Sequence, residues 1–172
     1  IKTVGEAGKI LMKYFGHIRP TAPRDPVKGI LSEADIESDR YICSAIERTY
    51  PNDGILTEES EPRLEQRRVW VADPLDGTTN FTRGVRDFVI YLALAEEGQP
   101  VVGVAYDPVN DDIFHAVRGD GAEFNGFGIH VSDRNMKESL IVLANVYDFP
   151  KLRDKGRKLR DSLTEETEPE KQ

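Results

Sequence analysis

Acidic residues follow two apolar segments of the sequence, in positions where their carboxylates could bind a metal ion. Asp73 and Asp76 come directly after the apolar run of residues 69–72, and Glu58 with its acidic neighbour follows the short apolar segment 55–57. Paired carboxylates repel one another, and a divalent cation relieves that repulsion. Carboxylate and carbonyl oxygens suit Mg²⁺ or Mn²⁺ rather than zinc. The pattern therefore favours a magnesium site where two strands end.

The segment that begins at Asp73 reads Asp-Pro-Leu-Asp-Gly-Thr-Thr-Asn-Phe. Pro74 fixes its own φ and favours an extended conformation at the residue before it, so we expect the two aspartates to lie in a short, stiff turn. Gly77 and Thr78 then offer a backbone that an anion can approach closely. A helix that begins near Thr78 would direct its free N–H groups toward a phosphate. The alternative is a plain Asx-type turn that carries two surface aspartates.

Other residue types that often carry chemistry are scattered along the chain. His17, His115 and His130 do not cluster with the acidic residues, and we interpret all three as structural or surface residues. The single cysteine, Cys43, lies in the apolar run 41–46 and is interpreted as a small core-facing residue. The sequence has no Gly-x-Ser-x-Gly, Cys-x-x-Cys or Walker-type loop. Covalent catalysis by serine or cysteine therefore has little support.

The elements that would position the acidic residues are two amphipathic helices and a series of strands. Apolar residues at helical spacing predict helices over residues 5–15 and 33–48, while residues 17–30, with three prolines, predict an exposed loop. The continuous apolar run at 69–72 is typical of a strand covered on both faces. Further strands are predicted over residues 55–57, 88–95, 101–106, 113–117 and 139–144. Hairpin-like connections favour an α+β fold, with helices layered on a largely antiparallel sheet.

Composition and charge limit the classes of function. The chain has 172 residues, and its net charge of −8 argues against binding nucleic acid through a basic surface. A small phosphate ester is still compatible, because bound cations reverse the local electrostatics. No apolar run is long enough to span a membrane, and no signal peptide is visible, so we expect a cytoplasmic protein without membrane association. We expect residues 1–150 to form the α+β domain and residues 151–172 a charged helix and tail.

Together, the two acidic segments resemble the paired signature of the inositol monophosphatase family. Residues 58–60 and 73–81 carry the main resemblance, and weaker similarities at 31–35, 102–108 and 119–126 follow in the same order. The family belongs to the lithium-sensitive, magnesium-dependent phosphatase superfamily. The resemblance implies that the chain is the N-terminal portion of an αβαβα sandwich.

The resemblance also implies a set of metal ligands. Glu58, Asp73 and the carbonyl of Leu75 would hold a first Mg²⁺ ion. Asp73 and Asp76 would hold a second, and Glu58 would help with a third. Mn²⁺ is an alternative metal.

Catalytic and phosphate-binding roles follow from the same resemblance. Thr78 would position the attacking water with Asp35 as its hydrogen-bonded partner, and Glu58 would contribute to catalysis. The backbone of Gly77 and Thr78 would bind phosphate. The implied reaction is direct in-line attack by metal-activated water on phosphorus, without a phosphoenzyme.

The expected substrate is a small phosphate monoester, with inositol monophosphate as the leading candidate. Fructose 1,6-bisphosphate and a nucleotide bisphosphate remain alternatives. Lithium sensitivity and a homodimer are carried over from the family. Two readings without turnover also stay open, namely a metal-binding or interaction fragment that is catalytically incomplete, and a structural α+β domain whose clustered carboxylates are incidental.

The sequence departs from the family pattern in two places. The family carries a further metal-binding aspartate directly after a tryptophan in its C-terminal half, but the one tryptophan here is Trp70 and no Trp-Asp pair exists. We therefore expect the C-terminal half of the family fold to be absent and the apolar surface that it would cover to be exposed. Gly29 stands where the family usually has an acidic residue.

Overall fold

The computed structural model describes residues 1–17, 22–23, 30–31, 33–58 and 60–135. The chain divides into two compact units, residues 1–130 and 131–172, and every described helix and strand lies in the first. The strand expected at 139–144 and the charged helix and tail expected at 151–172 lie outside the described residues. The expected domain boundary at residue 150 does so too, and all three stay predictions.

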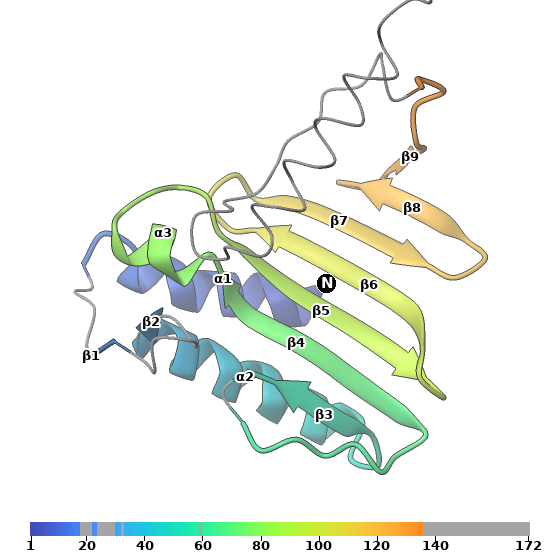
Figure 1. Cartoon of the computed structure of the whole chain (residues 1–172), viewed down its shortest axis with the longest axis horizontal. Helices are drawn as coiled ribbons and strands as arrows, with labels where there is room; N and C mark the ends of the chain where they lie inside the picture. The colour runs from blue at the N-terminus through green and yellow to red at the C-terminus, as the bar shows by residue number, and fades with distance from the viewer. Residues whose placement is uncertain (18–21, 24–29, 32, 59, 136–172) are drawn as a thin grey trace, which may run out of the picture. The chain divides into compact units, whose positions relative to one another are not determined.

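The centre of the first unit is a seven-stranded sheet with the strand order β3-β4-β5-β6-β7-β8-β9 (Figure 1). β3 pairs with β4 in parallel, and all the other neighbouring pairs are antiparallel. This architecture confirms the α+β class and the largely antiparallel sheet. The strands are β3 (Gly54–Thr57), β4 (Arg68–Asp76), β5 (Val89–Glu96), β6 (Gln99–Asp107), β7 (Asp112–Val117), β8 (Gly121–Phe124) and β9 (Phe127–Ile129).

A second, minimal ladder lies in the proline-rich segment that was predicted as a loop. There β1 (Ala22–Pro23) pairs antiparallel with β2 (Ile30–Leu31). Each strand has only two residues, so the prediction of a loop is wrong for these two short stretches. The residues between the two strands are not described.

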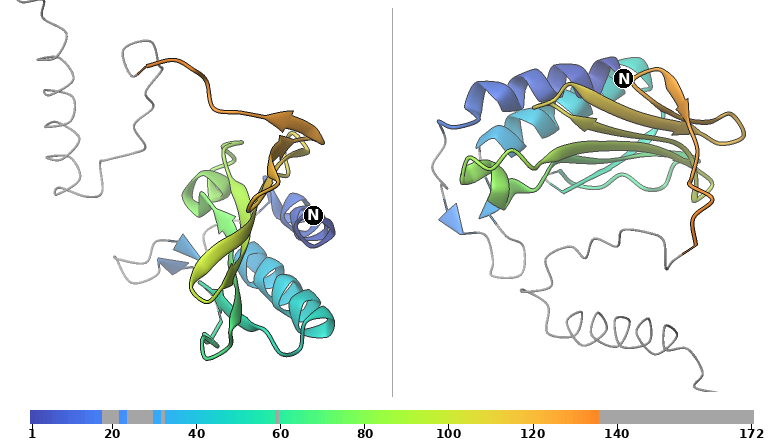
Figure 2. Two further views of the ribbon diagram at one scale, coloured as in Figure 1. Left: turned by 90° about the vertical axis from the view of Figure 1, so that its right-hand side faces the viewer. Right: turned by 90° about the horizontal axis from the view of Figure 1, so that it is seen from above.

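Both long helices pack on the same face of the seven-stranded sheet (Figure 2). α1 (Lys2–Tyr14) and α2 (Glu33–Thr49) agree with the predicted helices to within a few residues. A third helix, α3 (Thr78–Thr82), is a single turn that follows β4. The core between helices and sheet is made of buried apolar side chains, among them Val4, Leu11, Ile42, Ile46, Ile55, Leu75, Phe81, Phe88, Ile90 and Leu92.

Close packing of α1 on the sheet explains a glycine in the middle of that helix. A Cβ atom on Gly8 would lie 2.5 Å from Cε1 of Tyr106 on β6 and 3.0 Å from Cβ of Pro108. Glycine normally weakens a helix interior, so its presence here reflects the space available rather than helix propensity.

Among the described elements, none covers the other face of the sheet. Val71 on β4 is 38% exposed, Tyr91 on β5 is 45% exposed and Phe114 on β7 is 46% exposed. The prediction that residues 69–72 form a strand covered on both faces is therefore wrong within the described structure. The expected exposure of an apolar surface is observed instead. None of the described helices is long and apolar enough to cross a membrane.

Candidate metal and phosphate site

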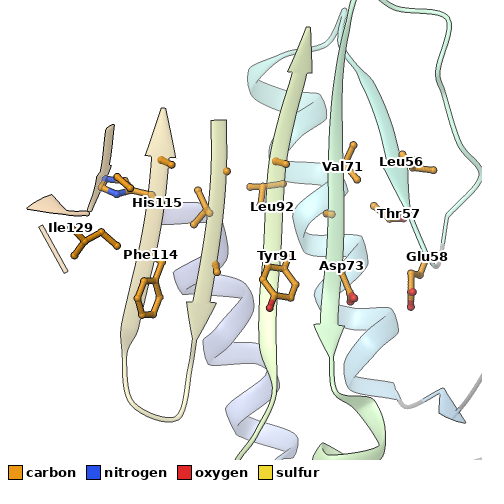
Figure 3. Close-up of a pocket in the computed structure, with 17 residues that line it drawn as sticks. Leu56, Thr57, Glu58, Val71, Asp73, Tyr91, Leu92, Phe114, His115 and Ile129 are labelled. Carbon is orange, nitrogen blue, oxygen red and sulfur yellow. The ribbon is translucent and has the colours of Figure 1, made fainter. Parts of the chain in front are cut away.

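Glu58 and Asp73 lie next to each other because β3 and β4 are parallel and each residue directly follows the last pair of their ladder. That pair is Thr57 with Ala72, so the next residue in each segment is acidic. Figure 3 shows both carboxylates on the sheet face that points away from the helices. The carboxyl ends of parallel strands are a common place for ligands to bind. Topology thus brings together two acidic residues that are fifteen positions apart in the sequence.

The carboxyl group of Asp73 lies in an electrostatically crowded position. Partial burial and the nearby charge of Glu58 raise its pKa to about 6, and the charges of Asp76 and Asp35 add to the effect. The backbone N–H of Leu75 opposes the rise in pKa by donating a 3.0 Å hydrogen bond to Oδ1 of Asp73. That bond is an Asx-type turn, so the alternative local geometry is present. It occupies one oxygen of Asp73 and does not remove the crowding of negative charge.

A break in the strand ladder shapes the segment between Asp73 and Asp76. The pairing with β5 shifts register between these two residues, as at a β-bulge. Pro74 lies in this break, where its missing N–H costs no ladder hydrogen bond. Its carbonyl accepts a 3.2 Å hydrogen bond from Oγ of Ser38 on α2. The stiff turn predicted from the sequence is therefore an irregular end of β4 that α2 supports.

Thr78 connects this irregular end to α2. Its Oγ1 lies 3.0 Å from Oδ1 of Asp35 and 3.0 Å from the carbonyl oxygen of Leu75. A hydroxyl group has one hydrogen to donate, so it satisfies one of these acceptors at a time. Donation to Asp35, which is 3% exposed, leaves the Leu75 carbonyl a lone pair for another partner. The predicted contact between Asp35 and Thr78 is present.

Gly77 makes the sharp change of direction from β4 into α3. Its φ of 91° and ψ of 30° lie in the left-handed region that glycine adopts most readily. A Cβ atom there would also lie 2.8 Å from the carbonyl oxygen of Asp87. α3 begins at the next residue, where the sequence predicted a helix start. Both the conformation and the close backbone approach therefore require glycine at this position.

Aromatic packing holds α3 in place below this turn. Phe81 is 2% exposed, and its ring centroid lies 5.6 Å from that of Phe15 and 4.9 Å from that of Phe88. Nδ2 of Asn80 donates a 2.9 Å hydrogen bond to the carbonyl of Asp87. The last two residues of the nine-residue motif are therefore structural, and they fix the residues before them.

The donor set fits a hard divalent cation in part. Glu58, Asp73 and Asp76 offer carboxylate oxygens, and Leu75 offers a carbonyl oxygen, which are the ligands that Mg²⁺ prefers. Among the described residues, however, no group of three or more His, Cys, Asp or Glu side chains is arranged to hold a metal ion. The residues therefore fit a cation through neighbouring carboxylates and a carbonyl, and the described arrangement lacks a complete three-carboxylate cluster. Glu59 lies outside the described residues.

Sequence reasoning missed Tyr91 and the buried polar residues beside the site. Tyr91 pairs with Asp73 across the ladder, and its pKa is raised by partial burial and by the charges of Asp76 and Asp73. No sequence signal marks it, since tyrosine is ordinary in a strand. Ser38 and Asp39 of α2 are buried polar residues. The helical spacing of α2 could have revealed them as polar positions on its buried side.

The histidines and the cysteine lie where the sequence analysis placed them. Two strands separate His115 on β7 from Asp73 on β4, a distance of roughly 14 Å at the usual strand spacing. His17 and His130 are exposed. Cys43 is partly buried and packs against the core, and burial raises the pKa of its thiol. None of the four belongs to the acidic cluster, by which we mean Glu58, Asp73 and Asp76.

A family model described as the inositol monophosphatase family matches residues 1–165. The chain belongs to this family. The match confirms the resemblance inferred from the two acidic segments, and it makes the chain a member of a phosphatase family.

Curated relatives within the inositol monophosphatase family carry two kinds of name. A "Fructose-1,6-bisphosphatase/inositol-1-monophosphatase" of Thermotoga maritima is 34% identical over 150 residues, which cover 87% of this chain and 58% of the relative. A "Nus factor SuhB" of Pasteurella multocida is 36% identical over 140 residues, covering 78% of this chain and 51% of the relative. The chain thus spans about half the length of the curated relatives it matches.

Solved structures of the inositol monophosphatase family share the fold. The extragenic suppressor protein SuhB of Bartonella henselae gives a TM-score of 0.72 at 36% identity, covering 77% of this chain and 52% of that one. Inositol monophosphatase II of Staphylococcus aureus gives 0.75 at 26% identity, covering 93% and 61%. A structure described as inositol monophosphate-bound SaIMPase-II gives 0.73 at 26% identity, covering 93% and 59%.

Proposed function

We propose that the chain forms the metal-binding portion of a magnesium-dependent phosphatase that hydrolyses a small phosphate monoester. The observation that carries the proposal is the position of Glu58 beside Asp73, directly after the last pair of the β3–β4 ladder. At the irregular end of β4, the carbonyl of Leu75 and the hydroxyl of Thr78 lie 3.0 Å apart, two and five residues after Asp73. Membership of a phosphatase family supports this reading of the acidic cluster.

In this proposal Glu58, Asp73, Asp76 and the carbonyl of Leu75 hold two or three Mg²⁺ ions, with Mn²⁺ as an alternative. When bound, the cations would activate water and stabilise the charge on the leaving oxygen. The metal-binding residues would act by holding the cations where a phosphate can bind to them.

The remaining residues handle water and phosphate. Thr78, with its hydrogen donated to Asp35, presents an oxygen that accepts a hydrogen bond from water and orients it toward phosphorus. The backbone N–H groups of Gly77 and Thr78 bind the phosphate oxygens. Glu58 contributes to catalysis because its carboxylate is one of the ligands that hold the cations at this site.

The decisive experiment measures Mg²⁺-dependent phosphate release from inositol 1-phosphate. Asp76→Asn is the test variant, and Asp120→Asn, in the exposed turn before β8, is the matched control. We expect the substitution of Asp76 to lower release at least 100-fold and that of Asp120 to leave it unchanged. Equal release by both variants would contradict the assigned site.

Inositol monophosphate is the first substrate to assay because one structural relative is described as binding it. Fructose 1,6-bisphosphate is the second, since the name of the Thermotoga maritima relative contains both activities. A nucleotide bisphosphate completes the set. We expect the largest kcat/KM with inositol 1-phosphate, and a larger value with another ester would reassign the substrate.

A second candidate function is a role without turnover. Several relatives are named "Nus factor SuhB", a name that contains no phosphatase activity. Calorimetry separates the two functions. Binding of Mg²⁺ without phosphate release would favour an interaction role, and an absence of divalent-ion binding would favour a structural domain.

Two further properties are proposed from the family resemblance, and a third from the cysteine content. Lithium should inhibit any phosphate release, and a LiCl titration tests this. The chain should form a homodimer, which light scattering on a sizing column tests. A cytoplasmic location is consistent with the single cysteine, and fractionation tests it.

A further inference from the structure

One face of α2 carries three buried polar residues, which is unusual for a helix that packs on a sheet. Asp35, Ser38 and Asp39 are 3%, 0% and 2% exposed. Their spacing of three and four residues places them on the same side of the helix. A buried polar group costs free energy unless it is hydrogen-bonded, so the partners of these residues decide what the arrangement is for.

Asp39 binds the loop that carries Glu58. The hydroxyl of Ser60 donates a hydrogen bond to Oδ2 of Asp39. The backbone N–H of Ser60 donates a second bond, of 3.2 Å, to Oγ1 of Thr57 at the end of β3. Ser60 is therefore fixed both to α2 and to the last residue of β3. Glu58 lies between these two attachment points.

Ser38 supports the other acidic strand end from the adjacent position on α2. Its hydroxyl donates to the carbonyl of Pro74, the residue directly after Asp73. One rigid helix thus holds the segment after β3 and the irregular end of β4 through neighbouring side chains. The distance between Glu58 and Asp73 depends on both attachments.

We propose that Asp39 is a positioning residue that sets the separation of the Glu58 and Asp73 carboxylates for the cation. It acts through Ser60 and in concert with Ser38, and it touches neither cation nor substrate. The inference rests on the proposed function, because the carboxylates need a fixed separation only if they share a ligand. Residues that orient metal ligands typically change metal affinity 10- to 100-fold when they are substituted.

The following variants distinguish a positioning role of Asp39 from a general effect on the stability of the fold. Asp39→Ala and Ser60→Ala each remove one side of the hydrogen bond, and Asp39→Asn keeps an acceptor oxygen at the same place. Ile42→Val is the matched control, because Ile42 is fully buried on the same helix and belongs to the apolar core. Urea unfolding of each variant provides the comparison of stability.

The first measurement is hydrogen–deuterium exchange in the loop after β3. We expect Asp39→Ala and Ser60→Ala to increase exchange of the Ser60 amide at least 10-fold while leaving β5 and β6 unchanged. Asp39→Asn should restore most of the protection. Ile42→Val should not increase exchange in the loop more than it increases exchange in the sheet. Loop exchange that is unchanged in Asp39→Ala would overturn the proposal.

The single cysteine gives a second measurement of the loop. Sγ of Cys43 lies 3.9 Å from Oγ of Ser60 and 3.9 Å from the carboxyl oxygens of Asp39. Burial raises the pKa of the thiol and the hydroxyl of Ser60 opposes that rise, so loss of the hydroxyl alone would slow alkylation at neutral pH. Release of the loop would instead expose the thiol, and we expect Ser60→Ala to react faster with iodoacetamide. Slower labelling would mean that the loop stays in place and would overturn the proposal.

Calorimetry with Mg²⁺ alone links the loop to the cation. We expect Asp39→Ala to weaken Mg²⁺ binding at least 10-fold, Asp39→Asn to recover most of it, and Ile42→Val to change it less than twofold. Equal weakening by Asp39→Ala and Ile42→Val would reduce Asp39 to a structural role. A lack of Mg²⁺ binding by the unchanged chain would instead refute the proposed function, and exchange in the loop would still decide whether Asp39 anchors it.

Discussion

Thr78 shows how one side chain can link the backbone turn to the buried interior. Its hydroxyl reaches a carboxyl group on α2 and a carbonyl at the end of β4, which are 40 residues apart in the sequence. A valine has almost the same shape and no hydroxyl. The substitution therefore isolates the hydrogen bond from the packing.

We expect Thr78→Val to lower the free energy of unfolding by about 1–3 kcal/mol, because Asp35 loses a hydrogen-bond donor while it stays buried. Thr78→Ser keeps the hydroxyl and should retain most of the stability. Phosphate release should fall with valine and survive with serine if Thr78 orients water. Urea unfolding and a phosphate assay on both variants check the prediction, and equal behaviour of valine and serine would contradict it.

For single residues, the sequence identified candidate functional residues well but their hydrogen-bond partners poorly. Asp73 and Asp76 were found because proline and glycine flank them in a recognisable motif. The hydrogen bond from Ser60 to Asp39 could not be found, because it joins residues from α2 and a loop with no distinctive spacing. Buried polar pairs of this kind become visible only when the elements are packed.

The turn between β4 and α3 determines where the helix begins and which backbone groups face the site. Gly77 occupies it with a positive φ and a close approach to the carbonyl of Asp87. Gly84 also has a positive φ, of 73°, but nothing lies within 4 Å of the position of a Cβ atom there. Comparing the two glycines therefore separates the free-energy cost of a left-handed conformation from the cost of a steric clash at Cβ.

We expect Gly77→Ala to lower the free energy of unfolding by about 2 kcal/mol or more and Gly84→Ala by only about 1 kcal/mol. Both variants pay for the left-handed conformation, and Gly77→Ala also displaces the backbone at Asp87. Chemical unfolding curves measure the difference. A larger loss for Gly84→Ala than for Gly77→Ala would show that the close approach at Gly77 is relieved at no cost.

Element prediction succeeded where periodicity is strong and failed where tertiary structure decides. α1 and α2 were predicted from regularly spaced apolar residues, and most strands from short apolar runs between turns. The extension of β4 to Asp76 was not predicted, because a proline normally argues against a continuing strand. The register break that accommodates Pro74 is a property of the paired strands.

The uncovered face of the sheet in the first unit carries a hollow. It has a volume of about 650 Å³ and extends from the acidic end of β3 and β4 across to β8 and β9 (Figure 3). Its floor is mostly apolar, and Val71 and Ile129, each 38% exposed, lie in its lining. Exposed apolar patches of this kind favour association with other apolar surfaces.

We expect the chain to bind the dye ANS and to self-associate through this face. Val71→Thr combined with Ile129→Thr should lower both the dye fluorescence and the weight-average mass from light scattering. Val85→Thr is the control, because Val85 is 47% exposed but lies outside the hollow. An equal decrease in the control variant would show that the dye responds to surface apolarity in general.

The single parallel pair among the described strands has a consequence for how the site comes into existence. From β5 to β9 each strand forms an antiparallel pair with its sequence neighbour through a short turn, so these contacts are local and can form early. The meeting of Glu58 with Asp73 instead requires β3 to align in parallel with β4, where partners are 15 residues apart and no tight turn can join them. The hairpins can therefore assemble while the acidic cluster is still open. A native-like β signal in circular dichroism would then report the scaffold and leave the cation-binding geometry unmeasured.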